Sequence, residues 1–533
     1  MRRRIRTAAI AVLVVGFAAG VAGAASPGDG PALSDVPTAN AKSAGLAPAS
    51  RLSPELRQIA VAQGSAKLEN GTAQVSYYGY DNDTVNADGE PQMLPTPSVS
   101  NEAHKTEPDK NTYLVFPRGL PGGDASYDYG THFLFQGHEG GTPGYITRIN
   151  LDADAAHRVT LLATADTTGA PIVTIDGSTW DPWAQRLLFT TENQNAPTYA
   201  ATPGYPSAVR DVSGALGRGG YEAIQDDGDG NIWIVEDIGG ANKTGTTAKI
   251  PNSFLYRYVP RQPGDLANGK LQVLQVRNAA GAPITQASQT AVNSPDQLAL
   301  HVYGSSFRTR WITIHDTASN GTAPFNANVL AKAADGTPFK RPENGVFRPG
   351  THFGEFYFDE TGDTNATSVE NASAGGWGSI FKLTQDGPSA NRGSLSIFLN
   401  GNQAHAGFDN IQFLSRDSLG VVEDAGDTLH GQRNALDSGY VLDADADYGD
   451  ASNQPLRWLA EGRDPSATID SAFGGFGKND GDNEITGLHV SNGDPTVHGV
   501  LGAEAPKLWH EGWRWFYTQQ HGDNLTFEVV PAG

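Results

Sequence analysis

The sequence predicts an all-β protein, a β-propeller of about six blades with insertions. Glycine (64 residues) and proline (32 residues) are abundant, 18% of the residues are charged, and long helical heptads are absent. Short alternating hydrophobic runs separated by Gly/Asp/Asn turns recur from Thr112 onward, which is typical of a sandwich, a barrel or a propeller. A hairpin frame that recurs along the chain favours the propeller, because repeated units of this kind form blades.

The first 25 residues have the layout of a signal peptide. Four arginines between positions 2 and 6 precede an apolar run at 8–21, and Ala22-Gly23-Ala24 is a small-residue cleavage site. The apolar run is shorter than the roughly 20 residues that span a membrane, and no second run of that length follows. We therefore expect a secreted protein, extracellular or periplasmic, cleaved near Ala24. Both the Sec and the Tat export routes stay open.

The rest of the chain divides into three predicted parts. Residues 26–50 are rich in Ala, Ser, Pro and Gly and predict a flexible leader. Residues 51–110 form an N-terminal extension, in which the pattern predicts a short helix over Ser53–Gln63 with Ser53 as its N-cap. Residues 111–533 form the propeller.

Charge and cysteine content restrict the partners. Without the four signal arginines the formal net charge goes from −22 to about −26, which argues against nucleic acid or an anionic membrane as partner and favours solubility and cation binding. No cysteine is present, so disulfides, thiolate metal sites and cysteine nucleophiles are excluded. Any metal must bind to carboxylate, carbonyl or imidazole groups, which favours hard cations such as Ca²⁺. We expect a monomer.

Eight hydrophobic runs predict strands of the propeller. Each is four to eight residues long, alternates in polarity and is bounded by turn residues. In order they are TYLVFPRG (112–119), THFLFQG (131–137), YITRINLD (145–152), RLLFTTE (186–192), NIWIVED (231–237), SFLYRYVP (253–260), SLSIFLN (394–400) and SLGVVED (418–424).

Two longer segments, 221–237 and 408–424, share one hairpin frame, and each contains one of these runs. Each opens with an acid, Glu222 or Asp409, and reaches a glutamate 14 positions later, Glu236 or Glu423. Looser copies cover 175–192 and 341–360, and a half-copy covers 483–494. The innermost strand of each blade lines the channel of a propeller, so acids that open equivalent hairpins would point at one place. A single such acid is usually a solvated turn residue, but converging carboxylates repel one another unless cations neutralise them. The repeat therefore predicts metal binding.

Two aspartate-rich loops have some features of calcium sites. Asp227-Gly-Asp229-Gly-Asn231 begins like an EF-hand loop, but Ile232 stands where the loop needs glycine and Ile238 where it needs glutamate, which favours a hairpin turn. Asp443-Ala-Asp445-Ala-Asp447 fails the same test; it is a peripheral calcium site or an acidic loop, and the loop is favoured.

Several segments, taken in order, resemble the PhoX-type alkaline phosphatases and the secreted propellers related to them. The longest is GRGGYEAIQDDGDGNIWIVEDIGG followed by NSFLYRYVPRQPGDLANGKL. The shorter matches are His138-Glu139, Asp181-Pro182-Trp183 through Glu192, Arg341-Pro342-Glu343, Asp409-Asn410 and Glu484-x-Thr486-Gly487.

The resemblance implies a propeller whose channel holds calcium and, in the phosphatases, iron, with a small-molecule phosphate ester as substrate. It implies that Arg341 contacts phosphate oxygens, for which its planar guanidinium is suited. It also implies metal ligands at Glu222, Glu343 and Glu484, with Asp409, Glu139, Glu192 and Asp176 as further candidates.

The chain departs from the family at one position. The phosphatases use a cysteine ligand to iron just upstream of the Asp181-Pro182-Trp183 match, where this chain reads Ile175-Asp176-Gly177-Ser178. Iron (Fe³⁺) is therefore in doubt. Either Asp176 substitutes as a hard ligand and gives an all-calcium site, or the catalytic cluster is lost. The leading hypothesis is a secreted calcium-dependent phosphatase. The alternatives are another metal-assisted hydrolase such as a lactonase, and a non-catalytic, calcium-stabilised propeller that binds an extracellular polymer or protein.

Overall fold

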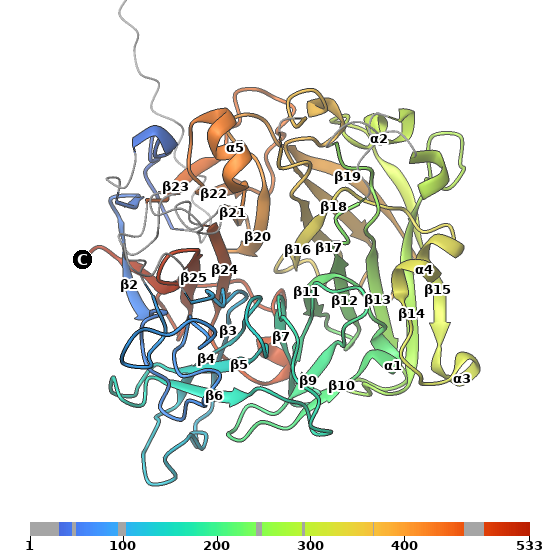
Figure 1. Cartoon of the computed structure of the whole chain (residues 1–533). Helices are drawn as coiled ribbons and strands as arrows, with labels where there is room; N and C mark the ends of the chain where they lie inside the picture. Colours follow the sequence, from blue (N-terminus) through green and yellow to red (C-terminus); the bar gives the residue numbers. More distant parts are fainter. Residues whose placement is uncertain are drawn as a thin grey trace, which may run out of the picture.

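Antiparallel strands form five sheets around a central axis in the computed structural model (Figure 1). It describes residues 31–44, 49–93, 103–240, 248–289, 294–365, 367–462 and 484–533. The predicted signal peptide, 1–25, lies outside the described residues. All eight predicted runs contain strands, and the all-β propeller is confirmed. No helix of the described residues is long and apolar enough to cross a membrane.

Each sheet is built mainly from strands that follow one another in the sequence. The first holds β3 (Thr112–Val115), β4 (His132–Gly137), β5 (Ile146–Asn150) and β6 (Val159–Ala163). The second holds β7 (Ser178–Asp181), β8 (Arg186–Phe189), β9 (Tyr199–Ala201) and β10 (Val209–Asp211).

The third sheet has nine strands and contains two of the predicted hairpins. Its order is β11 (Tyr221–Asp226), β12 (Ile232–Glu236), β13 (Leu255–Pro260), β14 (Gly269–Val276), β15 (Phe307–Asp316), β19 (Arg392–Asn400), β18 (Ser379–Gln385), β17 (Glu355–Glu360) and β16 (Pro342–Phe347). The sheet consists of two strand groups, β11 to β15 and β16 to β19, which are joined at their outer edges by the pairing of β15 with β19. The inner strands of the two groups, β11 and β16, both face the axis.

The last two sheets combine the two ends of the chain. One holds β20 (Phe408–Phe413), β21 (Ser418–Glu423), β22 (Ser438–Asp443), β23 (Leu456–Ala460) and β1 (Arg51–Leu52). The other holds β24 (Glu484–Ser491), β25 (Arg514–Gln520), β26 (Leu525–Pro531) and β2 (Leu56–Ala62). The short helix η1 (Lys42–Ala44) precedes the first strand. The other short helices lie between strands: α1 (Ser213–Leu216), α2 (Pro295–Leu300), α3 (Thr317–Asn320), α4 (Ala327–Ala333), α5 (Gly426–Arg433), η2 (Gln286–Gln289), η3 (Ala372–Ala374) and η4 (Val497–Gly499).

Six inner strands close a ring around the axis. Each of β3, β7, β11, β16, β20 and β24 contacts the next, and β24 contacts β3. The ring brings the start of every inner strand to the same mouth of the channel. Figure 1 shows these six labels around the centre of the molecule.

The helix predicted over Ser53–Gln63 is wrong, because this segment contains β2. Leu56 to Ala62 pairs with β26 from the C-terminal end of the chain, and Leu56 packs into the core of that sheet. Local propensity favoured a helix, but the partner strand comes from more than 460 positions away and satisfies the backbone groups of an extended segment. Upstream, Val36 N donates to Arg457 O, so residues of the predicted leader lie against β23.

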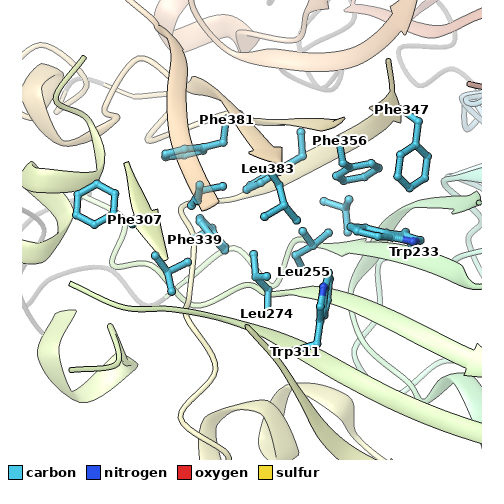
Figure 2. Packing of buried hydrophobic residues seen from close by; sticks show 14 of the residues in the cluster. Trp233, Leu255, Leu274, Phe307, Trp311, Phe339, Phe347, Phe356, Phe381 and Leu383 are labelled. Atoms are coloured by element: carbon cyan, nitrogen blue, oxygen red, sulfur yellow. The ribbon is translucent and has the colours of Figure 1, made fainter. Parts of the chain in front are cut away.

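Aromatic side chains fill the space between the two halves of the nine-stranded sheet (Figure 2). Trp233 on β12 lies 4.8 Å from Phe356 on β17 and 4.9 Å from Trp311 on β15, measured between ring centroids. Such rings bury large apolar areas and prefer tilted or edge-on contacts. This packing fixes β11 relative to β16, the two inner strands that carry central acids.

Candidate metal centre

A break in the strand register places an acid at the start of several inner strands. In β11, β16 and β20 the pairing shifts by one residue just after Tyr221, Pro342 and Phe408. A β-bulge of this kind turns the bulged residues out of the regular alternation. In each case the residue that follows the last regular pair is acidic: Glu222, Glu343 and Asp409.

The same arrangement precedes β3, where the sequence had not indicated it. Pro108 forms a bridge with His138, and regular pairing resumes at Thr112 with Phe135, again shifted by one residue. The acid after Pro108 is Asp109, which is buried. It escaped prediction because a long insertion separates β3 from β4 and hides the hairpin frame. A fifth acid, Asp176, precedes β7.

A second set of acids follows the second strand of the hairpins. Glu139 follows β4, Glu192 follows β8 and Asp237 follows β12. The sequence frame singled out Glu236 in this position, but Glu236 accepts hydrogen bonds from Phe254 N and Tyr256 OH inside the sheet. Its neighbour Asp237 faces the other way, into the ring, because adjacent strand residues point to opposite sides.

The two sets interleave into three overlapping groups of three carboxylates. Within each group the ligand oxygens all lie within 4.8 Å of one another. Every group combines the opening acid of one hairpin, the closing acid of the same hairpin, and the opening acid of the next. The groups are Asp109–Glu139–Asp176, Asp176–Glu192–Glu222 and Glu222–Asp237–Glu343. Five of the seven predicted metal ligands therefore come together, joined by Asp109 and Asp237.

The two remaining predicted ligands, Asp409 and Glu484, lie on the other side of the ring. The charges of Asp109 and Asp424 raise the pKa of both residues, so Asp409 and Glu484 belong to the same carboxylate ring. In β24 the register shifts after Thr486, so Gly487 occupies the place that Asp409 has in β20. Glu484 precedes Gly487 by three residues. Glu484 Oε2 lies 3.2 Å from Nε2 of His521.

Crowding makes these carboxylates poor acids. Burial first, and the neighbouring carboxylates second, raise the pKa of Glu139, Asp176, Asp409 and Glu484 well above the usual range. The same causes raise the pKa of Glu222 and Glu343. Glu192 is exposed to the cavity but flanked by protein atoms, and this partial removal from water, followed by the charge of Asp237, raises its pKa to about 7. Such a ring either takes up protons or binds cations.

Arg341 lies beside the third group. Its Nε donates to Asp237 Oδ2 at 2.7 Å, and its Nη1 donates to Thr364 Oγ1 at 2.9 Å. Its Nη2 lies 3.4 Å from Glu343 Oε1. The side chain is 22% exposed, so the guanidinium is fixed by protein on one side and accessible on the other.

A cavity of about 740 Å³ opens onto Arg341 and the acids. Glu192, Asp237 and Arg341 reach it from the ring. The segment before β7 and the loops that follow β8, β12 and β17 supply the rest of its wall. These further lining residues are Thr174, Asn193, Gln194, Ile238, Gly239, Lys249 and Thr364. The wall is largely polar, which suits a hydrated, charged ligand.

His138, the neighbour of Glu139, is part of the core. Its Nε2 lies 2.9 Å from Thr147 Oγ1 and its Nδ1 lies 3.1 Å from Thr106 Oγ1, and the ring stacks on Tyr145. Burial lowers the pKa of His138 well below the usual value. Only Glu139 of the pair faces the ring. In the loop that follows β11, Asp227 accepts from Asp229 N and Trp233 Nε1, which confirms the predicted hairpin turn.

Comparison with known proteins identifies related chains. The family model of alkaline phosphatase PhoX matches residues 246–497, which contain Arg341, Glu343, Asp409 and Glu484. No curated protein matches the chain in sequence. Among solved structures, Pseudomonas fluorescens PhoX in complex with vanadate, a transition state analogue, is similar over 94% of this chain and 98% of that chain, with 11% identity and a TM-score of 0.51.

At 11% identity this similarity shows the fold. A gluconolactonase from Xanthomonas campestris is similar over 93% of this chain and 98% of that chain, but with 10% identity and a TM-score of 0.38 it carries no argument. The family resemblance indicated by the motifs is confirmed over residues 246–497, the part of the chain that the family model of alkaline phosphatase PhoX matches.

Proposed function

We propose that the protein is a secreted, calcium-dependent phosphatase that hydrolyses small phosphate esters in the channel mouth. The observation that carries the proposal is the contact of Arg341 with Asp237, an acid of the third carboxylate group, at the edge of an open polar cavity. A cation-binding group and a phosphate-binding group are thereby adjacent. The family match supports a phosphatase-type hydrolase.

The residues present fit hard cations. All ligands offered by the three groups are carboxylate oxygens, which Ca²⁺ prefers. With no thiolate in the chain, this donor set favours Ca²⁺ over iron. Asp109, Glu139, Asp176, Glu192, Glu222, Asp237 and Glu343 would hold the cations.

When bound, cations at these groups would polarise a phosphoryl oxygen and favour ionisation of a bound water. Arg341 would bind the phosphate. Its Nε, Nη1 and Nη2 donate to Asp237, Thr364 and Glu343, so the planar head is held in place. One N–H group on each terminal nitrogen would be left for a phosphate oxygen. A charge held in place before the reaction stabilises the extra negative charge of a phosphoryl transition state without reorganising.

The cavity wall would receive the alcohol part of the ester. Asn193 and Gln194 on one side and Lys249 on another can hydrogen bond to hydroxyl or anionic groups. A lactone has no anionic group that would use Arg341, so the arginine favours the phosphatase over a lactonase.

The direct test is an assay of the purified mature protein. We expect turnover of p-nitrophenyl phosphate or bis-p-nitrophenyl phosphate with Ca²⁺, loss of turnover after chelation, and recovery with Ca²⁺ but not with Fe³⁺ alone. Turnover only after addition of Fe³⁺ would contradict the all-calcium site. No turnover of either substrate under any condition, together with a lower melting temperature after chelation, would favour the non-catalytic calcium-stabilised propeller.

Export is part of the proposal and has its own test. Expression of the full chain in a bacterial host, followed by N-terminal sequencing of the protein found outside the cytoplasm, should give a start next to Ala24. A protein that stays in the cytoplasm and still carries residues 1–24 would contradict the proposed export.

A further inference from the structure

One buried lysine, Lys110, lies inside the carboxylate ring. It directly follows Asp109 and is 7% exposed. Its Nζ donates to Asn410 Oδ1 at 3.0 Å and to the backbone oxygen of Leu488 at 2.9 Å. Both partners are neutral. Burial lowers the pKa of Lys110 to about 8, and the nearby acids Asp109, Asp409, Asp359 and Asp176 offset part of this effect because they favour the ammonium form.

The position of Lys110 is equivalent in three inner strands. Lys110 follows the acid Asp109 at the bulge before β3, Asn410 follows Asp409 at the bulge in β20, and Leu488 follows Gly487 at the bulge in β24. The lysine therefore donates to the residues that occupy its own place in the other two strands. This links β3, β20 and β24 through a single ammonium group.

Asn410 connects Lys110 to the carboxylate of Asp409 through hydrogen bonds. Its side-chain oxygen accepts from Lys110, and its Nδ2 donates to Asp409 Oδ1 at 2.9 Å. The opposite oxygen, Asp409 Oδ2, has no partner among the described residues, and the same holds for Oδ2 of Asp359 on β17. Two orphaned buried carboxylate oxygens thus lie near one fixed positive charge, which lowers their electrostatic cost.

The carboxylate groups that suit external ions lie elsewhere. In the described part of the chain, all three groups whose oxygens lie within 4.8 Å of one another come from the arc between β3 and β16. On the arc formed by β20 and β24, the protein itself supplies the ammonium group of Lys110, and the His521 ring lies beside Glu484. The ring is acidic all round but is neutralised differently on its two sides.

We propose that Lys110 is a positioning residue that takes the place of a metal ion on the β20–β24 side of the ring. External cations are then confined to the three groups between β3 and β16. The lysine also holds Asn410, and through it Asp409, in a fixed orientation. This inference rests on the proposed calcium centre, because it concerns how that centre limits its own ion content.

The test is a count of bound Ca²⁺ in the full mature protein, by elemental analysis after equilibrium dialysis. Lys110→Ala removes the charge and opens space beside Asp409 and Asp359. We expect about one more Ca²⁺ per chain than in the wild type, because the two orphaned oxygens become ligands for an ion. Lys270→Ala is the matched control. Lys270 is exposed and pairs with Asp316 at the surface, so its removal should leave the count unchanged.

A second variant protects the test from a folding failure. Lys110→Met fills the space without charge, and it should lower the melting temperature in chelator and show a larger Ca²⁺-induced rise than the wild type. An unchanged ion count in Lys110→Ala together with a wild-type rise in Lys110→Met would overturn the role of Lys110 and leave the calcium centre intact. A wild-type protein that binds no Ca²⁺ would overturn both.

Discussion

Nε of Arg341 donates a 2.7 Å hydrogen bond to Oδ2 of Asp237, across 104 positions of sequence. Asp237 is also a member of the third carboxylate group, with Glu222 and Glu343. One carboxylate therefore faces an arginine on one side and a candidate cation site on the other. We therefore expect the orientation of Arg341, the proposed phosphate-binding group, to be coupled to the occupancy of the candidate cation site.

Asp237→Asn breaks this coupling while it preserves the shape of the side chain. We expect kcat/KM to fall about 100-fold, or ~2.7 kcal/mol of transition-state stabilisation, because Arg341 loses its charged anchor and the third group loses a ligand. Steady-state kinetics on p-nitrophenyl phosphate measures it. Asp450→Asn, an exposed turn carboxylate, is the control and should keep wild-type kinetics; equal activity in the two variants would contradict the role of Asp237.

Arg341→Ala should lower kcat/KM by about 10²–10³-fold, since a single preorganised charge at the transition state contributes that much. Arg341→Lys should recover little of this loss, because an ammonium group cannot donate to Asp237 and Thr364 while it also binds two phosphate oxygens. The measurement is the kinetics of both variants beside their thermal unfolding. Full activity of Arg341→Ala would instead assign the arginine a structural role.

Two glutamates should differ in their effect on the ion content. Glu222 belongs to two of the carboxylate groups, whereas Glu139 belongs to one. We therefore expect Glu222→Gln to weaken two cation sites and Glu139→Gln one, with a correspondingly larger loss of bound Ca²⁺. Isothermal titration of the metal-free variants with Ca²⁺ measures this. Equal losses would mean that the groups do not act as separate sites.

The stability of the metal-free protein should fall as the pH rises. Burial and crowding raise the pKa of Glu222, Glu343 and Asp409 well above the usual range, and that of Glu192 from 4.5 to about 7. Between those values the folded state binds more protons than the unfolded state, so the free energy of unfolding decreases with rising pH. Ca²⁺ replaces the protons and removes the penalty.

Melting temperatures from pH 5 to pH 8 check this expectation. In chelator the melting temperature should decline through pH 7, and in Ca²⁺ it should change much less. A metal-free protein that is more stable at pH 8 than at pH 5 would show that ionisation of the ring carboxylates does not destabilise the folded state.

Local patterns were enough for the strands and most of the acids. Alternation and turn residues encode each hairpin within fewer than 20 residues. The repeated frame marked Glu222 and Asp409 without any knowledge of pairing, and the family resemblance added Glu343. The frame failed where the hairpin is interrupted, as at Asp109. It also chose Glu236 over Asp237. These two adjacent acids point to opposite faces of the strand, and the sequence frame does not tell which face lies toward the ring.

What the sequence by itself determined is the propeller architecture, the lack of any thiolate ligand and the identity of most central carboxylates, since these depend on neighbouring residues and on composition. What only the tertiary structure decided is which carboxylates share a site, that Arg341 and Asp237 are partners, that Lys110 reaches Asn410 and Leu488, and that residues 56–62 form a strand. The physical reason is the same in each case. Ring closure brings together segments hundreds of positions apart, and the energy of a carboxylate, a lysine or an extended backbone depends on what lies beside it in space.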